Sequence, residues 1–211
     1  MRLSTGFRRD AGFTLIELLI AVVILGVIMV PLTNAVIGVI RNVDATTDRL
    51  LLSHDAQISA AYFARDVAGV GLRDYAASGM PFKASIQQNA AYNAGGQTCG
   101  TVATPTALVR FLADDWDTSG GTPTQVTVIA AYYLVPVGPV SELHRLRCAG
   151  TAPATDAVLA HYVAPATVSL SCSSTCTAAA VPDQVTLSFT VTKGTVGGYP
   201  VILNGQRRQT S

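Results

Sequence analysis

The apolar and polar positions of the chain divide it into an apolar segment, an amphipathic segment and a region of short alternating runs. No residue between Leu18 and Ile40 carries a formal charge. At about 1.5 Å per residue, a helix over this stretch is about 35 Å long, which is enough to cross a hydrocarbon core of about 30 Å. Pro31 lacks a backbone donor and predicts a kink or local melting in the middle of this helix. We therefore predict a membrane-spanning helix over residues 13–40.

The helix is predicted to continue as an amphipathic helix over residues 41–72. Apolar residues recur there at steps of three and four, and Gly69 and Gly71 offer stop signals. His54 falls on or near the apolar stripe and is expected to be packed or half-exposed. The stripe needs a partner that covers it, and a sheet formed by the rest of the chain would supply one. The predicted stripe comprises Val43, Thr47, Leu50, Leu51, Ile58, Ala61, Tyr62 and Ala68, and the charged residues largely off it are Arg41, Asp44, Asp48, Arg49, Asp55 and Asp66.

Residues 73–105 have the composition of a variable loop region, with a short helix expected near residues 84–92. Strand patterns follow over residues 106–203, which predicts an α+β fold: a long N-terminal helix packed on an antiparallel β-sheet. The polar, basic end over residues 204–211 is expected to be a disordered tail. The expected strands are Thr106–Leu112, Gln125–Pro136, Glu142–Cys148, Ala157–Val163, Thr167–Cys172 and the alternating stretch that contains Val185, Leu187, Phe189 and Val191.

The most informative charged residues lie at the N-terminus. Arg2, Arg8 and Arg9 precede the apolar segment, and the positive-inside rule then keeps the N-terminus in the cytoplasm and the globular region outside it. The formal net charge of +1 gives no basic field over the whole chain, so nucleic acid is not an expected partner. Four further arginines are interpreted as a solvated face rather than a DNA-binding patch: Arg145, Arg147, Arg207 and Arg208.

All four cysteines, Cys99, Cys148, Cys172 and Cys176, follow the apolar segment. If that part of the chain is translocated, an even number of cysteines in an oxidising compartment favours disulfides. Three pairings are possible, and we favour Cys172–Cys176 with Cys99–Cys148, because residues 172 and 176 flank a short Ser-Ser-Thr turn. A zinc site is the competing interpretation, although no histidine or fifth cysteine lies nearby in the sequence.

One stretch invites comparison with a calcium-binding loop. Asp115, Asp117 and Ser119 occupy the first, third and fifth places of such a loop, and Gly120 occupies the sixth. The twelfth place is Val126, which cannot supply a bidentate carboxylate. A polar hairpin turn between two strands is therefore the preferred interpretation, and no cofactor is otherwise expected.

The chain offers no residue set typical of an enzyme. Its three histidines, His54, His144 and His161, are not accompanied by a nucleophile elbow, a Ser-x-x-Lys pair, a zinc-protease motif or a phosphate-binding loop. His144 and His161 fall in expected strands and are interpreted as surface or cross-strand residues. We do not expect catalysis.

The order of signals at the N-terminus differs from that of an ordinary secretory signal. The small pair Ala11-Gly12 comes before the apolar run instead of after it. The residues directly after Gly12 are Phe13-Thr14-Leu15-Ile16-Glu17. This arrangement resembles the class III signal of type IV prepilins and type II secretion pseudopilins. The resemblance implies that residues 1–12 are a leader, that prepilin peptidase cleaves between Gly12 and Phe13, and that the new Phe13 amine is methylated. Asp10 and Ala11 stand where many relatives have a basic residue beside the glycine, which we expect to modulate processing without abolishing it.

Glu17 is the polar residue that most needs an explanation. A carboxylate within a membrane costs up to about 2.5–3.5 kcal/mol on insertion scales unless it is paired. After cleavage, the nearest cation is the Phe13 amine of the same chain or of a neighbouring subunit. In the pilin family the fifth mature residue is held to pair with an adjacent N-terminus during assembly. The alternative is an interfacial carboxylate that extends into water.

Several short stretches also resemble the J-type minor pseudopilins and W-type minor pilins. This implies a pilin-like fold, a place in a priming or tip complex with other pilin or pseudopilin subunits, and a path from the inner membrane into an extracytoplasmic filament. The rival interpretation is a single-pass anchored adhesin or receptor that never polymerises. These stretches are Tyr132–Leu134, Leu143–Arg147, Val158–Val163 and Val185–Leu187, while Ala64–Gly69 resembles a stretch common late in this helix in minor pilins.

Overall fold

The computed structural model describes residues 13–91, 99, 106–150, 155–194 and 196–209. The chain divides into two compact units, one through Thr46 and the other from Thr47 onward. We call them the helical unit and the globular unit. Helix α1 (Leu15–Ala68) contributes residues to both units.

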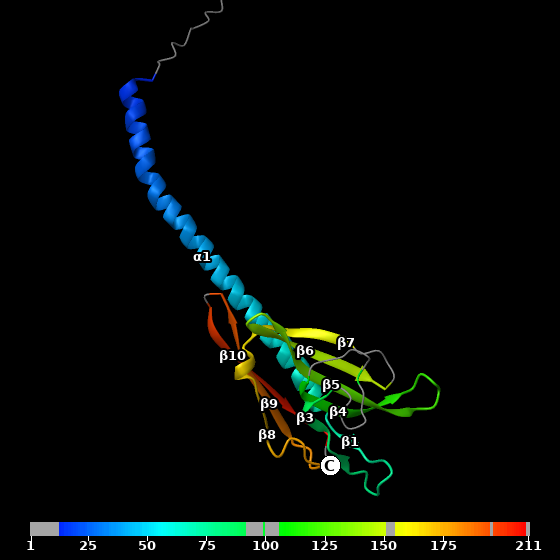
Figure 1. Ribbon diagram of the computed structural model, residues 1–211. Helices are drawn as coiled ribbons and strands as arrows, with labels where there is room; N and C mark the ends of the chain where they lie inside the picture. Colours follow the sequence, from blue (N-terminus) through cyan, green and yellow to red (C-terminus); the bar gives the residue numbers. More distant parts are fainter. Residues whose placement is uncertain (1–12, 92–98, 100–105, 151–154, 195, 210–211) are drawn as a thin grey trace, which may run out of the picture. The chain divides into compact units, whose positions relative to one another are not determined.

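The helical unit consists of the first part of α1 (Figure 1). Thr14 stands just before the helix, and its carbonyl and hydroxyl oxygens both accept from the backbone N–H of Glu17, at 3.1 and 3.3 Å. A threonine at this place satisfies a donor that the first helical turn leaves unpaired. The helix continues through Pro31, so the local melting expected there does not occur. Beside it, the Thr33 hydroxyl donates to the carbonyl of Met29 at 2.9 Å.

The globular unit contains an eight-stranded antiparallel sheet with the order β10-β9-β7-β6-β5-β4-β3, in which β8 also pairs with β9 (Figure 1). A separate two-stranded sheet and a short 3-10 turn complete it. The strands of the large sheet are β3 (Ile86–Ala90), β4 (Ala107–Asp117), β5 (Thr124–Val137), β6 (Val140–Ala149), β7 (Thr155–Val163), β8 (Ser169–Cys172), β9 (Gln184–Lys193) and β10 (Val196–Gln206); the small sheet pairs β1 (Leu72–Arg73) with β2 (Phe82–Lys83), and the turn is η2 (Pro165–Thr167).

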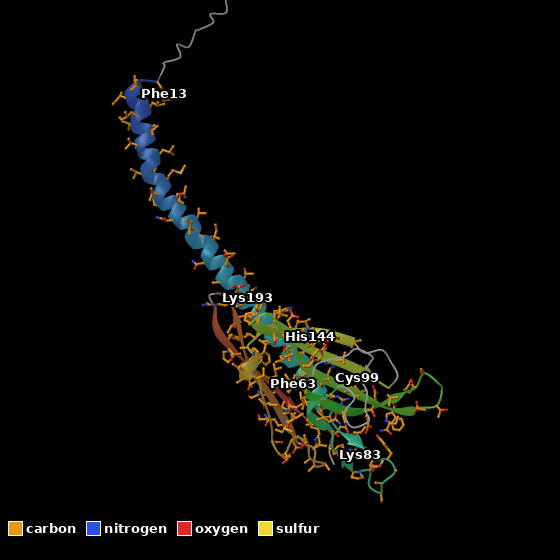
Figure 2. The ribbon with its side chains drawn as sticks, in the orientation of Figure 1. Phe13, Phe63, Lys83, Cys99, His144 and Lys193 are labelled. Carbon is orange, nitrogen blue, oxygen red and sulfur yellow. A yellow bond between two sulfur atoms is a disulfide. The ribbon has the colours of Figure 1, made fainter. Side chains whose placement is uncertain are left out.

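Residues 52–67 of α1 form the centre of the main core. Phe63, which Figure 2 labels, is fully buried. Its ring meets those of Phe111 and Tyr132 edge to face, with ring centroids 5.6 and 5.4 Å apart. Leu52 and Val67 are buried in the same core. Each such side chain contributes about 1.5–3 kcal/mol when it is removed from water, so this part of α1 is fixed by packing on the sheet. The result is the α+β, pilin-like fold that the sequence predicts.

A gap in the sheet is closed by side chains of α1. Strands β7 and β9 share only the pair Val163 and Val191, so most of that edge of β7 has no strand beside it among the described residues. The buried Ser59 hydroxyl donates to the carbonyl of Leu159 at 3.0 Å, and the Asp55 carboxylate accepts from the backbone N–H of His161 at 3.0 Å. Two polar residues of α1 thus replace part of a missing ladder.

The predicted apolar stripe of α1 was placed on the wrong face in part. Leu50 is 66 % exposed and His54 is also exposed, whereas Asp55, predicted to lie largely off the stripe, is buried. The Asp66 side chain is only 6 % exposed. The carboxylates of Asp55 and Asp66 can be buried between α1 and the sheet because the sheet provides hydrogen-bond donors for them.

Two further expectations were wrong. The segment near residues 84–92 contains strand β3, which pairs with β4, rather than a helix. The expected disordered tail begins inside strand β10, and the backbone N–H of Arg208 donates to the carbonyl of Ala68 at 3.1 Å. Pairing with a neighbouring strand decides both outcomes, and local composition does not report it.

Candidate functional site

The helical unit exposes a long and mostly apolar surface. Every side chain from Phe13 to Ile40 is exposed, and Phe13 itself is 83 % exposed (Figure 2). By length and composition, α1 qualifies as a helix that could cross a membrane. An apolar surface of this extent on a water-soluble monomer is rare and marks a surface that lipid or protein covers.

The predicted processing and assembly residues lie at the start of this surface. Gly12, on one side of the predicted cleavage site, lies outside the described residues, and Phe13 is the first described residue. Glu17 lies in the first turn of α1, where a negative charge is favourable to the helix dipole. Its carboxylate makes no ion pair with any of the described residues.

In the globular unit, a buried ion pair joins α1 to the sheet. The Arg145 guanidinium donates to both oxygens of Asp66 at 2.6 Å, and the Tyr132 hydroxyl donates to Asp66 at 2.7 Å. Burial lowers the pKa of Arg145, but hydrogen bonds to Asp66 and its charge outweigh that effect and raise the pKa above its usual value. Burial, followed by the charge of Asp66, raises the pKa of Tyr132. The raised pKa values keep Arg145 charged and the Tyr132 phenol neutral at ordinary pH, so this group positions α1 on the sheet.

The interpretation of the arginines as a solvated face is therefore wrong for two of them. Arg145 is buried, and the Arg207 side chain is only 8 % exposed, where it pairs with Asp183. A charged pair is tolerated in such a place when its hydrogen bonds are made.

A second polar group runs from α1 across β7 and β6. His161 Nδ1 lies 2.8 Å from Asp55, and His161 Nε2 lies 3.9 Å from Glu142. His144 lies between Glu142 at 3.3 Å and Asp156 at 3.2 Å (Figure 2 labels His144). No serine, threonine or cysteine side chain within the described ranges bonds to either imidazole. The arrangement is a cross-strand network that links α1 to the sheet, as the interpretation of His144 and His161 as cross-strand residues requires.

The calcium candidate lies at the hairpin between β4 and β5. The Asp117 carboxylate accepts from the backbone N–H of Ser119 at 2.8 Å, which lowers the pKa of Asp117. The Asp115 carboxylate accepts from the backbone N–H of Trp116 at 2.9 Å. In the part of the chain that the structure describes, no group of three or more His, Cys, Asp or Glu side chains is placed to hold a metal ion. The carboxylates here shape a polar hairpin.

The four cysteines form two disulfides, Cys99–Cys148 and Cys172–Cys176. This is the favoured pairing, and it leaves no thiolate for the competing zinc site. The first disulfide ties Cys99 to β6, and the second closes the short loop after β8.

Sequence reasoning missed the buried polar residues that seat α1. Asp55, Ser59 and Asp66 lie on the same side of the helix as Phe63 and Val67, but a count of apolar positions gives polar residues no weight. The available signal was their spacing from the apolar residues: Ser59, Phe63 and Val67 follow one another at steps of four, with Asp55 four residues earlier.

Comparison with known families gives one match. A family model described as the prokaryotic N-terminal methylation motif matches residues 7–33. Neither the curated proteins nor the solved structures contain a match to the chain. The matched motif covers the predicted cleavage site, Glu17 and most of the exposed apolar surface, and it supports a place for this chain in the type IV pilin-like prepilin family.

Proposed function

We propose that the chain is a minor pilin or pseudopilin, a structural subunit of a type IV pilus-like or type II secretion filament. Prepilin peptidase removes residues 1–12, the Phe13 amine is methylated, and the helical unit enters the filament. The globular unit then faces outward in a priming or tip complex with other minor subunits. The observation that carries the proposal is the match of the methylation motif to residues 7–33, whose described part lies almost wholly in the exposed apolar start of α1.

Two environments in succession account for the exposed apolar surface. Before assembly, lipid covers residues 13–40, since a helix of this length spans the hydrocarbon core. In the filament, helices of neighbouring subunits replace the lipid. Each fully buried aliphatic side chain contributes about 1.5–3 kcal/mol relative to water, so the surface is not left bare at either stage. A chain that only needed an anchor would require the first environment alone.

Glu17 gives this proposal a residue-level mechanism. Its carboxylate makes no ion pair among the described residues, and its cost in a membrane falls when it meets a cation. The Phe13 amine created by cleavage is such a cation. When it belongs to a neighbouring subunit, the pair forms only on assembly, and that makes assembly favourable.

The N-terminus tests the processing step. Mass spectrometry of the membrane-extracted chain should show a mature protein that begins at a methylated Phe13. In cells without prepilin peptidase, residues 1–12 should remain attached. An intact leader in cells with active peptidase contradicts the proposal.

A charge substitution separates assembly from anchoring. Glu17→Ala should insert in the membrane normally but lose incorporation into filaments, measured by shearing filaments from cells and probing for this chain. Asp44→Ala, which removes another exposed carboxylate of α1, is the matched control and should assemble normally. Two results together would favour the anchored adhesin or receptor instead. The Glu17→Ala variant would be displayed on the surface as before, and the wild-type chain would not be recovered in sheared filaments.

A further inference from the structure

The outer edge of β10 has no strand beside it within the part of the chain that the structure describes. β10 stands at one end of the eight-stranded sheet and pairs there with β9 (Figure 1). Beyond its last residue, the N–H of Arg207 donates to the carbonyl of Asp183 at 2.8 Å and continues the same ladder. Hydrogen-bonded pairs alternate along an antiparallel ladder, so odd-numbered residues of β10 direct their backbone groups to β9 and even-numbered residues direct them away.

The outward backbone groups of β10 therefore form a free row. The N–H and C=O groups of Ile202, Asn204 and Gln206 point away from β9, and none of them bonds to another described residue. The next outward residue ends the row, because the N–H of Arg208 donates to the carbonyl of Ala68 on α1. Unpaired donors and acceptors that recur at the repeat of a strand are a template for another extended backbone.

This edge lacks the features that usually block strand pairing, which are charges, prolines and bulges. From Gly194 to Gln206 the sequence has no charged residue, and its one proline, Pro200, precedes the free amides. The irregularity of the ladder lies between Val196 and Tyr199, so the pairing with β9 is regular from there to Gln206. The second half of β10 is thus a regular, uncharged edge.

The opposite edge of the sheet, β3, is less suited to pairing. It has five residues, compared with eleven in β10. Within it, Asn89 has a φ of 47°, in the left-handed region, which interrupts the extended backbone. On β10, by contrast, the side chain of Ile202 is 62 % exposed and offers apolar surface that a neighbouring strand would cover. A further strand is therefore expected at β10.

The cost of ordering a chain decides which strand this is. A flexible peptide loses about 1–2 kcal/mol of backbone entropy per residue when it becomes extended, whereas each new hydrogen bond contributes only about 0.5–1.5 kcal/mol net. A strand that is already extended avoids this cost. The free edge of β10 in a second copy of the chain is such a strand. Antiparallel pairing about a two-fold axis also keeps the Arg207 side chains of the two copies at opposite ends of the ladder.

We infer that two copies of the chain associate through β10, whose free edges pair antiparallel and join the two sheets into one. Pairing centred on Leu203 sets Ile202 opposite Asn204 of the other copy, and Gln206 opposite Pro200, whose carbonyl also points outward. Such a contact is small and belongs with transient interfaces. The association involves the globular unit alone, so it does not depend on the function proposed for the helical unit.

Amide hydrogen exchange of the full-length chain in detergent micelles tests this pairing residue by residue. At low protein concentration, the amides of Ile202, Asn204 and Gln206 should exchange freely. Those of Val201 and Leu203 should be protected at every concentration, because they bond to β9. As the concentration rises, exchange of the three outward amides should become slower. If their rates are unchanged at about 1 mM, where even an association of about 4 kcal/mol is half formed, the inference is wrong.

A proline at the edge removes one outward donor. Ile202→Pro keeps the bonds to β9, because the amide of residue 202 points away from that strand, and proline is tolerated at such edge positions. The slower exchange of Asn204 and Gln206 should then require roughly tenfold more protein, since each copy loses a hydrogen bond. Ile202→Val keeps the amide and should behave as wild type. An unchanged concentration dependence in Ile202→Pro contradicts the pairing.

Charges at the same position identify the partner as a second copy. Ile202→Lys and Ile202→Glu should each abolish the slower exchange at Asn204, because like charges then lie diagonally across the paired strands. An equal mixture of the two variants should restore it. Val158→Lys, at an exposed position of β7, is the control and should behave as wild type. Near-ultraviolet circular dichroism verifies that each variant is folded, and failure of the mixture to restore slower exchange overturns the inference.

Discussion

The ion pair between Asp66 and Arg145 is the sharpest test of how α1 is held on the sheet. The two side chains are 6 % and 4 % exposed, and both guanidinium hydrogen bonds are 2.6 Å long. Asp66→Ala leaves a buried guanidinium without its carboxylate, and Tyr132 loses its acceptor as well. Removal of one partner from a buried pair destabilises a protein by about 3–5 kcal/mol. We expect a loss of that size in the free energy of unfolding.

Replacement of both partners should give a different result. Arg145→Met alone leaves the Asp66 carboxylate buried with only the Tyr132 hydroxyl, and should also be costly. The double variant Asp66→Leu with Arg145→Met removes both charges at once and should be more stable than either single variant, because the desolvation penalty disappears together with the attraction. It should remain about 1–3 kcal/mol below wild type, since the buried Tyr132 hydroxyl loses its acceptor. The coupling between the two sites should therefore be several kcal/mol.

The matched control is the exposed pair of Asp74 and Lys83, 3.4 Å apart with side chains 33 % and 50 % exposed. Asp74→Ala should cost no more than about 1 kcal/mol. Urea unfolding of the full-length chain in micelles measures all variants by near-ultraviolet circular dichroism, which reports the packed aromatic rings of the globular unit rather than the helical unit. A loss below about 1 kcal/mol for Asp66→Ala, or a double variant no more stable than the singles, would refute the reasoning.

Three other predictions use the same measurement. Gly205→Ala should cost about 1–3 kcal/mol, because the added Cβ would lie closer than 3.0 Å to every side-chain carbon of Val67. Ser59→Ala should cost about 1–3 kcal/mol, since it leaves a buried carbonyl of β7 without its donor. Burial raises the pKa of both Tyr132 and Tyr133 in the folded protein. Above about pH 10 the unfolded chain therefore loses these protons first, and the free energy of unfolding should fall as the pH rises. A urea midpoint that does not change with pH would contradict this prediction.

The sequence predicts the strands of the sheet well where one face is buried and the other is wet. In β9, buried Val185, Leu187, Phe189 and Val191 alternate with less buried neighbours, and the alternation is visible in the sequence. Strand β3 cannot be predicted from an alternating pattern, because the central residues of its sequence Ile-Gln-Gln-Asn-Ala are all polar. Its strand conformation comes from the ladder with β4, which lies well beyond it in the sequence.

The face of α1 is predicted poorly for a related physical reason. A carboxylate enters a core only where donors await it, and the donors for Asp66 are Arg145 and Tyr132 on strands far along the chain. No local window of the sequence contains both sides of this arrangement. The N-terminal methylation motif is the opposite case, since it is a short contiguous stretch and can be recognised from that stretch alone.

The change in burial along α1 bears directly on function. Apolar residues occur on both sides of Thr46, yet those of residues 13–40 are all exposed, whereas Leu52, Phe63 and Val67 are buried against the sheet. The described part of the chain therefore provides no surface that covers residues 13–40. A continuous apolar helix is not stable when it is bare in water, so its cover must come from lipid or from other molecules. Glu17, the only carboxylate in that stretch, then lies where a cation from another molecule can meet it.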